Sequence, residues 1–295
     1  MPIYEYSDRL SGYEIGDNPF VFKCLYCKSY LAVTEIRDIW PIRNKQILQV
    51  HRDTAETYKE IHDLEDCYLD LELDTKDTNV MIHYCWNCGW WRLIKNICIC
   101  AREHQIWDIK FGCAGALRNL DVTDINVPLE DVRKFLTANY AKRINVNPRL
   151  FEELVADVFR GLGYLADVTA YSKDGGIDII LKDSNGATIG VQVKRQKDAI
   201  EAEQIRSFVG ALLLGDYTSG IYVTTSHYRA GATDAARKSG KKGIAIELLD
   251  AKRFYDALNI TQKLQERIDF LPFIISRESI PKISFYGYDT PKNSL

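Results

Sequence analysis

Residues 172–197, SKDGGIDIILKDSNGATIGVQVKRQK, decide the fold of the second half of the chain. Two apolar runs flank the short turn SNG at 184–186, and this pattern predicts a β-hairpin. Because side chains alternate between the two faces of a strand, Gln192 and Lys194 point the same way. The hairpin brings Asp178, on the preceding strand, next to both of them.

A carboxylate, an amide and a lysine at one edge of a sheet suit the hydrolysis of phosphodiester bonds. Mg2+ or Mn2+ prefers oxygen ligands, which Asp178 and the amide of Gln192 can supply. Metal-bound water loses a proton readily, and Lys194 can orient that water or neutralise the charge that develops during attack. Taken singly, Asp178 would be a surface residue near a turn, and Lys194, Arg195 and Lys197 a solvated face. Together with the hairpin, they predict a catalytic site.

The segments around the hairpin alternate between helix and strand. Asn147-Pro148 is a good helix start, and apolar residues repeat at three-to-four spacing from Leu150 to Leu162. Further strands are predicted near 165–170, 177–181, 187–194, 221–225 and 244–248, and further helices over 199–214, over 229–239 and from 250. Such alternation predicts an α/β domain with a mixed sheet flanked by helices.

The order of these motifs resembles the Mrr-type catalytic domain of restriction endonuclease-like proteins, a branch of the PD-(D/E)xK nuclease superfamily. The resemblance covers about residues 148–255 and is carried by FEELVADVFRGLGY, KDGGIDI, GVQVKR, IRSFVGAL and IYVTTSHYRAGATDAA, in that order. The family's motif, an Asp on one strand and (E/Q)-x-K on the next, falls on Asp178, Gln192 and Lys194. A glutamate of the first helix often assists, which implies Glu152, with Glu153 as the alternative.

One departure from the superfamily pattern concerns the metal. Many members carry Glu at the position of Gln192, and a neutral amide binds Mg2+ more weakly than a carboxylate does. Gln is common in the Mrr branch, so the resemblance still implies an active enzyme, while a second metal ion is less well supported.

The resemblance implies Mg2+-dependent cleavage of DNA, in the restriction of foreign or modified DNA in a prokaryotic defence system. Cutting both strands would require two active sites, hence a homodimer or a partner protein. The rival interpretation is a non-catalytic module that binds nucleic acid or assembles a complex, and a structure-specific nickase or an RNase is the nearer alternative. The presence of both Asp178 and Lys194 favours the enzyme, since a binding module has no evident need for both.

Polar residues that follow the strands are candidates for contact with DNA. Arg195 and Lys197 follow the catalytic lysine, and Ser226 and His227 follow the strand at 221–225. A Ser/His nucleophile pair is disfavoured there because neither an orienting acid nor a G-x-S-x-G turn is visible. A further basic cluster either contacts phosphates or only keeps a helix end in solution. It consists of Arg237, Lys238, Lys241 and Lys242.

The first part of the chain is set apart by its cysteines, since all eight fall between residues 24 and 113. Two C-x-x-C pairs, Cys24 with Cys27 and Cys85 with Cys88, predict two knuckles that together form a tetrahedral zinc site. Their wide separation makes residues 28–84 an insertion in a β-rich, zinc-ribbon-like domain. The alternative is four buried thiols. Four other residues are weaker candidates: His83 and His104 could compete as ligands, and Cys98 and Cys100 are expected in the core.

The whole chain of 295 residues suits two domains. We expect the zinc-ribbon-like domain over 1–115, a helical connector over 116–147, and the nuclease-like domain with a C-terminal tail over 148–295. The formal net charge of −3 excludes a generally basic surface but allows a local basic cleft for DNA. The sequence contains no long apolar run and no signal-peptide pattern. We therefore expect neither a membrane partner nor export, and we expect the protein to be cytoplasmic.

Overall fold

The computed structural model describes residues 3–7, 23–36, 53, 56, 60, 80–101, 104–170, 175–264 and 284–289. The chain divides into two compact units. Unit 1 comprises Met1–Ile3 and Arg118–Arg267, and unit 2 comprises Tyr4–Leu117 and Ile268–Leu295. The sequence analysis set the first boundary at 115/116 and kept the tail with the second half, whereas this division groups the tail with unit 2. No described helix is long and apolar enough to span a bilayer.

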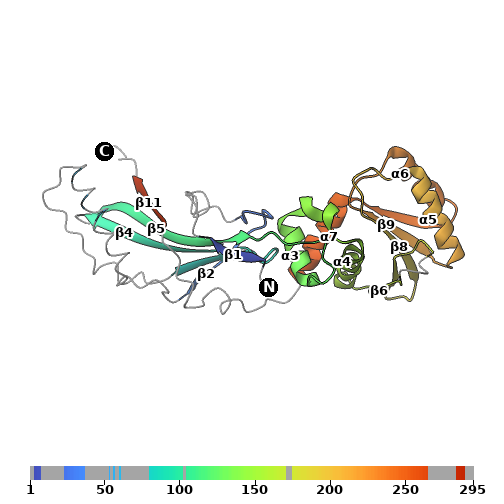
Figure 1. Cartoon of the computed structure of the whole chain (residues 1–295), viewed down its shortest axis with the longest axis horizontal. Helices are drawn as coiled ribbons and strands as arrows, with labels where there is room; N and C mark the ends of the chain where they lie inside the picture. Colours follow the sequence, from blue (N-terminus) through green and yellow to red (C-terminus); the bar gives the residue numbers. More distant parts are fainter. Residues whose placement is uncertain are drawn as a thin grey trace. The chain divides into compact units, whose positions relative to one another are not determined.

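Unit 1 is built on a five-stranded mixed sheet in the order β10-β9-β8-β7-β6 (Figure 1). The strands are β6 Leu165–Val168, β7 Ile179–Lys182, β8 Thr188–Lys194, β9 Ser219–Thr224 and β10 Ala245–Leu249. β6, β7 and β8 pair antiparallel, whereas β8, β9 and β10 pair parallel. Parallel neighbours need crossover connections, which α5 and α6 provide. The predicted fold class, a mixed sheet flanked by helices, is confirmed.

Helices cover both faces of this sheet (Figure 1). On one face lie α4 Pro148–Gly161 and α7 Ala251–Leu264, against which α3 Leu129–Ala138 packs, and on the other lie α5 Ala202–Leu214 and α6 Ala230–Gly240. A short 3-10 helix, Tyr140–Asn145, connects α3 to α4. Phe151 and Phe254 join α4 to α7, with ring centroids 5.5 Å apart. Phe208 of α5 packs edge-on against Tyr222 of β9 at 5.3 Å. Each face therefore has its own apolar core.

The start of α4 follows from its sequence. The side chain of Asn147 accepts hydrogen bonds from the backbone N–H groups of Arg149 (3.0 Å) and Leu150 (3.4 Å), and Pro148 occupies the first helical position. These contacts satisfy N–H groups that have no partner within the helix. The predicted cap is confirmed, and it fixes where the first turns of α4 present their side chains.

Unit 2 is built on an antiparallel sheet in the order β1-β5-β4-β3-β2. Its strands are β1 Tyr4–Ser7, β2 Ala32–Ile36, β3 Val80–Tyr84, β4 Trp91–Ala101 and β5 His104–Leu117. β11, Ser284–Asp289, also pairs with β5. β2 and β3 belong to the predicted insertion at 28–84, so the described ends of that segment are part of the scaffold. Apart from residues 53, 56 and 60, the stretch between them lies outside the described residues.

Candidate functional site

The hairpin of β7 and β8 brings Asp178 against the end of β8. The regular pairing of the two strands begins at Ile179 and Val191, and Asp178 directly precedes it. The backbone N–H of Asp178 donates to the carbonyl of Val191 (2.8 Å), and its Oδ2 accepts from the backbone N–H of Val193 (2.6 Å). Asp178 was predicted within the strand and comes directly before it. Its carboxylate is anchored on the β8 backbone between Gln192 and Lys194.

The other two predicted catalytic residues lie at the end of β8. Gln192 is half-buried, and a Cβ added at Gly176 would lie 3.8 Å from its Nε2, so the amide is next to the glycine turn. Lys194, two residues further along the strand, is exposed. Tyr222 is the Cα partner of Gln192 in β9, and its pKa is raised to about 12 by burial and by the negative charge of Asp178. A carboxylate, an amide and an ammonium group thus come from adjacent positions at one end of the hairpin.

Both candidate glutamates of α4 pair with Arg149. Its Nη1 lies 3.2 Å from Oε2 of Glu152, and its Nη2 lies 3.4 Å from Oε1 of Glu153. The same Nη1 donates to the carbonyl of Thr169 (2.7 Å), and Thr169 in turn binds the carbonyl of Asp178 through its N–H (2.9 Å) and hydroxyl (3.1 Å). The Glu152 side chain is 18% exposed and that of Glu153 is 37% exposed. Of the two, Glu152 shares the Arg149 nitrogen that connects α4 to the Asp178 segment.

The candidates for contact with DNA have different surroundings. Arg195 is half-buried and donates to the carbonyl of Ile144, while Lys197 is exposed. Ser226 is buried, and its hydroxyl donates to the carbonyl of Lys197 (2.8 Å) and lies 3.3 Å from Nδ1 of the exposed His227. Arg195 and Ser226 therefore hold loops together, and Lys197 and His227 present polar groups to the solvent.

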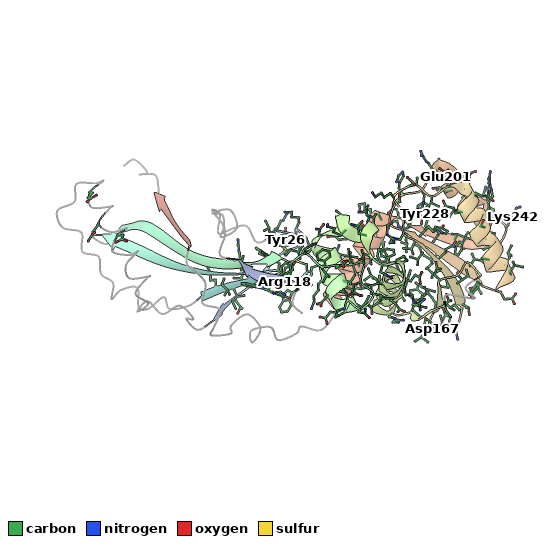
Figure 2. All side chains as sticks on the ribbon, in the orientation of Figure 1. Tyr26, Arg118, Asp167, Glu201, Tyr228 and Lys242 are labelled. Carbon is green, nitrogen blue, oxygen red and sulfur yellow. The ribbon has the colours of Figure 1, made fainter. Side chains whose placement is uncertain are left out.

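The loops after β8 and β9 run beside each other. The hydroxyl of Thr225 accepts from the N–H of Gln196 (2.9 Å) and donates to its carbonyl (2.8 Å). Tyr228, labelled in Figure 2, donates to the carbonyls of Tyr222 (2.6 Å) and Leu249 (3.3 Å), which lie on β9 and β10. This end of the sheet is thus a well-connected platform from which Lys197 and His227 project.

The basic cluster at the end of α6 is partly neutralised within the helix. Arg237 and Lys238 both pair with Asp234, and these contacts hold the pKa of Asp234 at about 2, well below its usual value. Lys241 and Lys242 are exposed beyond them. The pairing favours the interpretation in which Arg237 and Lys238 keep the helix end in solution over the one in which they contact phosphates.

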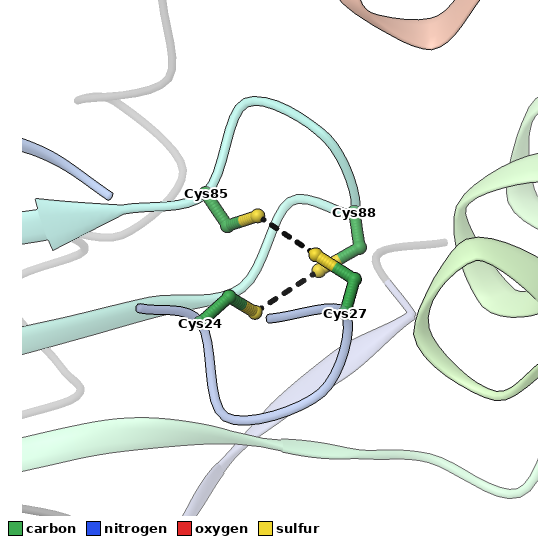
Figure 3. Close-up of side chains that lie close together, drawn as sticks. All are labelled: Cys24, Cys27, Cys85 and Cys88. Atoms are coloured by element: carbon green, nitrogen blue, oxygen red, sulfur yellow. Dashed lines mark hydrogen bonds between the residues drawn. The ribbon is translucent and has the colours of Figure 1, made fainter. Parts of the chain in front are cut away.

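The four predicted zinc ligands of unit 2 come together in one cluster (Figure 3). Their sulfur atoms all lie within 4.8 Å of one another, with Cys24 Sγ 3.5 Å from Cys88 Sγ and Cys27 Sγ 3.3 Å from Cys85 Sγ. Zn–S bonds of about 2.3 Å in a tetrahedron require sulfur atoms about 3.8 Å apart. The spacing and the donor set therefore fit a zinc ion. Within the described residues, this is the one group of three or more His, Cys, Asp and Glu side chains arranged to hold a metal.

The two C-x-x-C segments have matching backbones. In the first, the N–H of Lys28 bonds to the carbonyl of Cys24 (3.2 Å), and in the second the N–H of Gly89 bonds to the carbonyl of Cys85 (2.8 Å). Lys28 and Gly89 both have positive φ angles, 61° and 83°. Glycine adopts this conformation without strain, whereas lysine does not. Lys28 therefore adopts the conformation that glycine adopts in the second segment, and the two turns share one geometry.

Two tyrosines attach this cluster to the sheet. Burial raises the pKa of Tyr4, so its neutral hydroxyl donates to Cys88 Sγ (3.1 Å). The hydroxyl of Tyr26, within the first C-x-x-C segment, accepts the N–H of Leu117 (3.0 Å). Tyr4 and Leu117 are Cα partners in β1 and β5. Each strand of this pair is therefore bonded to one of the two cysteine segments.

Of the two histidines predicted as competing ligands, His83 does not join the cluster. His83 is buried on β3 opposite Arg92, and its pKa is lowered to about 4 by burial and by the charge of Arg92. It is not one of the clustered donors. The side chains of His104, Cys98 and Cys100, whose placement was predicted, lie outside the described residues.

Sequence reasoning missed three contributors to these sites: Arg149, Thr169 and Tyr4. Arg149 stands three and four residues before the candidate glutamates, a spacing that favours ion pairs on a helix and was a usable signal. The contacts of Thr169 and Tyr4 join segments that are far apart in the sequence, and no local pattern indicates them.

Comparison with known proteins finds related sequences for unit 1. Residues 144–258 match the Mrr catalytic family, described as restriction endonuclease. The type IV methyl-directed restriction enzyme EcoKMrr of Escherichia coli (strain K12) is 33% identical over 101 residues, which are 32% of this chain and 33% of that protein. The chain thus spans a third of the length of this curated relative.

Comparison with solved structures finds two restriction enzymes among its matches. The MspJI restriction endonuclease in complex with a 27-mer oligonucleotide is 22% identical, with a TM-score of 0.29 over 46% of this chain and 31% of that chain. The DNA modification-dependent restriction endonuclease AspBHI is 14% identical, with a TM-score of 0.32 over 57% of this chain and 56% of that chain.

Proposed function

We propose that the protein is a Mg2+-dependent endonuclease that hydrolyses phosphodiester bonds of DNA, a proposal supported by the match of residues 144–258 to the Mrr catalytic family and by the similarity to EcoKMrr. The observation that carries the proposal is the hydrogen bond between the Asp178 carboxylate and the N–H of Val193, which holds this carboxylate on β8 between Gln192 and Lys194. The side chains of Asp178, Gln192 and Lys194 are the donors and the cation that phosphodiester hydrolysis requires.

Each residue has a distinct role in the proposed reaction. Asp178 and the amide oxygen of Gln192 would hold Mg2+ or Mn2+, and Glu152 would complete or support the site. When bound, the metal supplies an acidic water and polarises a phosphoryl oxygen. Lys194 is exposed at the strand end, where its ammonium group can orient the attacking water and stabilise the negative charge that builds up on the phosphate. The bond to the N–H of Val193 keeps the Asp178 carboxylate from rotating away.

In unit 2 we propose a structural zinc ion held by Cys24, Cys27, Cys85 and Cys88. Three of these cysteines are at least 99% buried, and Tyr4 donates a hydrogen bond to one of the sulfurs. Buried thiolates with outer hydrogen-bond donors are typical of closed structural sites, which leave no position for substrate. The zinc ion therefore stabilises the unit and takes no part in hydrolysis.

The substrate we propose is foreign or modified DNA, in a defence role within the cytoplasm. The methyl-directed activity named for the Escherichia coli relative supports this choice. Lys197 and His227 are exposed and would contact phosphates, and a homodimer or a partner protein would supply the second active site for a double-strand cut. A non-catalytic binding module is the competing function. It explains the polar loops, and it gives no reason for Asp178 and Lys194 to stand together.

Supercoiled plasmid provides the direct test. The purified protein is incubated with methylated and unmethylated plasmid in Mg2+ or Mn2+, and nicked and linear products are separated on a gel. We expect metal-dependent cleavage that Lys194→Ala reduces by about 100-fold or more, as loss of a charge-stabilising group does. A preference for the methylated plasmid would establish modified DNA as the substrate.

Lys182→Ala is the matched control. Lys182 is an exposed lysine on the same hairpin, at the opposite end from Lys194 and paired with Thr188. Its loss should leave cleavage unchanged. If the folded wild-type protein binds DNA and cuts neither plasmid with either metal, the binding-module interpretation replaces the nuclease.

A further inference from the structure

Arg149 has a position that helix stability does not explain. It is the second residue of α4, after Pro148, and no acidic residue occupies that first turn. A cation there faces the positive end of the helix dipole, which is unfavourable. Its side chain is nevertheless only 20% exposed and is held on α4 by two carboxylates. A surface lysine or arginine that merely solubilises a helix would project into water.

The contacts of Arg149 connect α4, which carries Glu152, to the segment before β7, which carries Asp178. Nη1 bridges Glu152 (3.2 Å) and the carbonyl of Thr169 (2.7 Å), which follows β6. Thr169 in turn binds the segment before β7, because its hydroxyl donates to the carbonyls of Ile177 (2.9 Å) and Asp178 (3.1 Å). A continuous set of hydrogen bonds therefore runs from the carboxylate of Glu152 to the backbone of Asp178.

Charge also favours this arrangement. Glu152 and Glu153 are two acidic groups that both lie beside the Arg149 guanidinium group, and their like charges repel each other without a cation between them. The guanidinium group offers several N–H donors in a rigid plane, so it can hold both glutamates and a carbonyl at once. A lysine at this position would have one compact cation for the same three partners.

We propose that Arg149 is a positioning residue, which sets the carboxylate of Glu152 relative to Asp178 and so shapes the site for a divalent cation. The inference rests on the proposed function, because it assigns Glu152 and Asp178 to one metal site. Arg149 acts through Glu152 and does not itself contact the metal or the substrate.

Binding of Mn2+ to the zinc-loaded full chain, followed by electron paramagnetic resonance of the free ion, tests the proposal without any need for turnover. Supporting residues of metal sites typically change affinity by about 10–100-fold when removed. We expect Arg149→Gln to weaken Mn2+ binding within that range. In a Glu152→Gln background the same substitution should cost nothing further, because the carboxylate that Arg149 positions is already gone.

Arg160→Gln is the control. Arg160 lies on the same helix and also binds a carbonyl of the sheet, that of Ala166, through Nε (3.1 Å) and Nη2 (2.8 Å), and its hydrogen bonds within the described residues involve neither glutamate. Its substitution should leave Mn2+ binding unchanged. Arg149→Lys, which keeps the charge and loses the planar fork, should give an intermediate affinity and covers the case in which Arg149→Gln does not fold.

The outcomes separate the two proposals. If the wild-type protein binds Mn2+ and Arg149→Gln or Arg149→Lys binds it equally well, the positioning role is wrong and the nuclease stands. An equal loss in the wild-type and Glu152→Gln backgrounds would also overturn it, since Arg149 would then act independently of Glu152. If the wild-type protein binds no Mn2+, the proposed metal site fails and the positioning role fails with it.

Discussion

At the scale of single residues, the pKa of Tyr222 responds to the charge of Asp178 in the proposed catalytic site. Tyr222 lies on β9 opposite Gln192, and its pKa rises from 10.0 to about 12, mainly through burial and then through the charge of Asp178. Because a negative neighbour disfavours the phenolate, replacing Asp178 by Asn should lower the pKa of Tyr222. The value should stay above 10.0, since burial remains.

This prediction is checked by NMR titration of protein with ring-labelled tyrosine. The chain has 17 tyrosines, so Tyr222→Phe is needed to identify the resonance. The matched substitution Asp167→Asn, at an exposed position of β6, should have no effect on it. An unchanged titration in Asp178→Asn would mean that Asp178 and Tyr222 do not sense each other.

The same shift affects stability at high pH. The folded state favours neutral Tyr222, so this group's contribution to stability is complete below pH 10 and is lost as the pH rises towards 12. Asp178→Asn should narrow the pH range over which this contribution to stability is lost.

Most of the candidate site was predictable at this scale, because Asp178, Gln192 and Lys194 stand in a short motif. Arg149 and Thr169 were not, because their roles depend on a contact between α4 and the end of β6.

Among the elements, α5 and β9 pack so closely that one glycine is required. A Cβ added at Gly220 of β9 would lie 2.5 Å from Cδ1 of Leu212 and 2.7 Å from Cε1 of Phe208. Both of these side chains are buried and cannot move aside freely. We expect Gly220→Ala to reduce the free energy of unfolding by about 1–3 kcal/mol, the usual cost of overpacking.

Gly210→Ala, in α5, should have the opposite effect on the free energy of unfolding. Gly210 lies inside α5, and an added Cβ would meet nothing within 4 Å. Alanine favours the helix over glycine by about 0.5–1 kcal/mol, so this variant should be more stable than the wild type. Urea denaturation of both variants measures the two effects. If Gly220→Ala is as stable as the wild type, α5 does not pack on β9 as closely as described.

Most elements of unit 1 could be predicted from periodicity and turn residues, with ends within a few residues of those observed. The start of α4 was fixed by Asn147-Pro148, and the β7–β8 turn by Ser184-Asn185-Gly186. The start of β7 was not, because Asp178 bonds through both its N–H and its carboxylate to β8 and leaves the regular ladder. In unit 2, the pairing of β11 with β5 joins residues 172 to 182 positions apart, from Ser284 with Gly112 to Asp289 with Trp107, and no sequence pattern specifies such a partner.

The whole molecule consists of two units with separate cores, and the proposed zinc ion belongs to one of them. Removal of zinc by a chelator should therefore destabilise unit 2 and leave unit 1 intact. Structural zinc contributes on the order of 10 kcal/mol to small domains, enough to abolish the unfolding transition of unit 2. Scanning calorimetry should show this loss, and so should Cys88→Ser.

Thr34→Ala, at an exposed position of β2 in the same sheet, serves as the control and should leave both transitions in place. Zinc content by mass spectrometry should be one ion per chain in protein purified without chelator. Two unaltered transitions in fully zinc-free protein would contradict a structural role for the four cysteines.

The chain leaves unit 1 after Ile3 and returns to it at Arg118, and the N–H of Arg118 donates to the carbonyl of Ile3 (2.9 Å). Departure and return are therefore neighbours, as in domains that tolerate the insertion of a second domain. The second unit is completed from the other end of the chain, because residues 268–295 also belong to it and β11 pairs with β5. An exchange of residues 4–117 alone would therefore leave β11 without its partner strand.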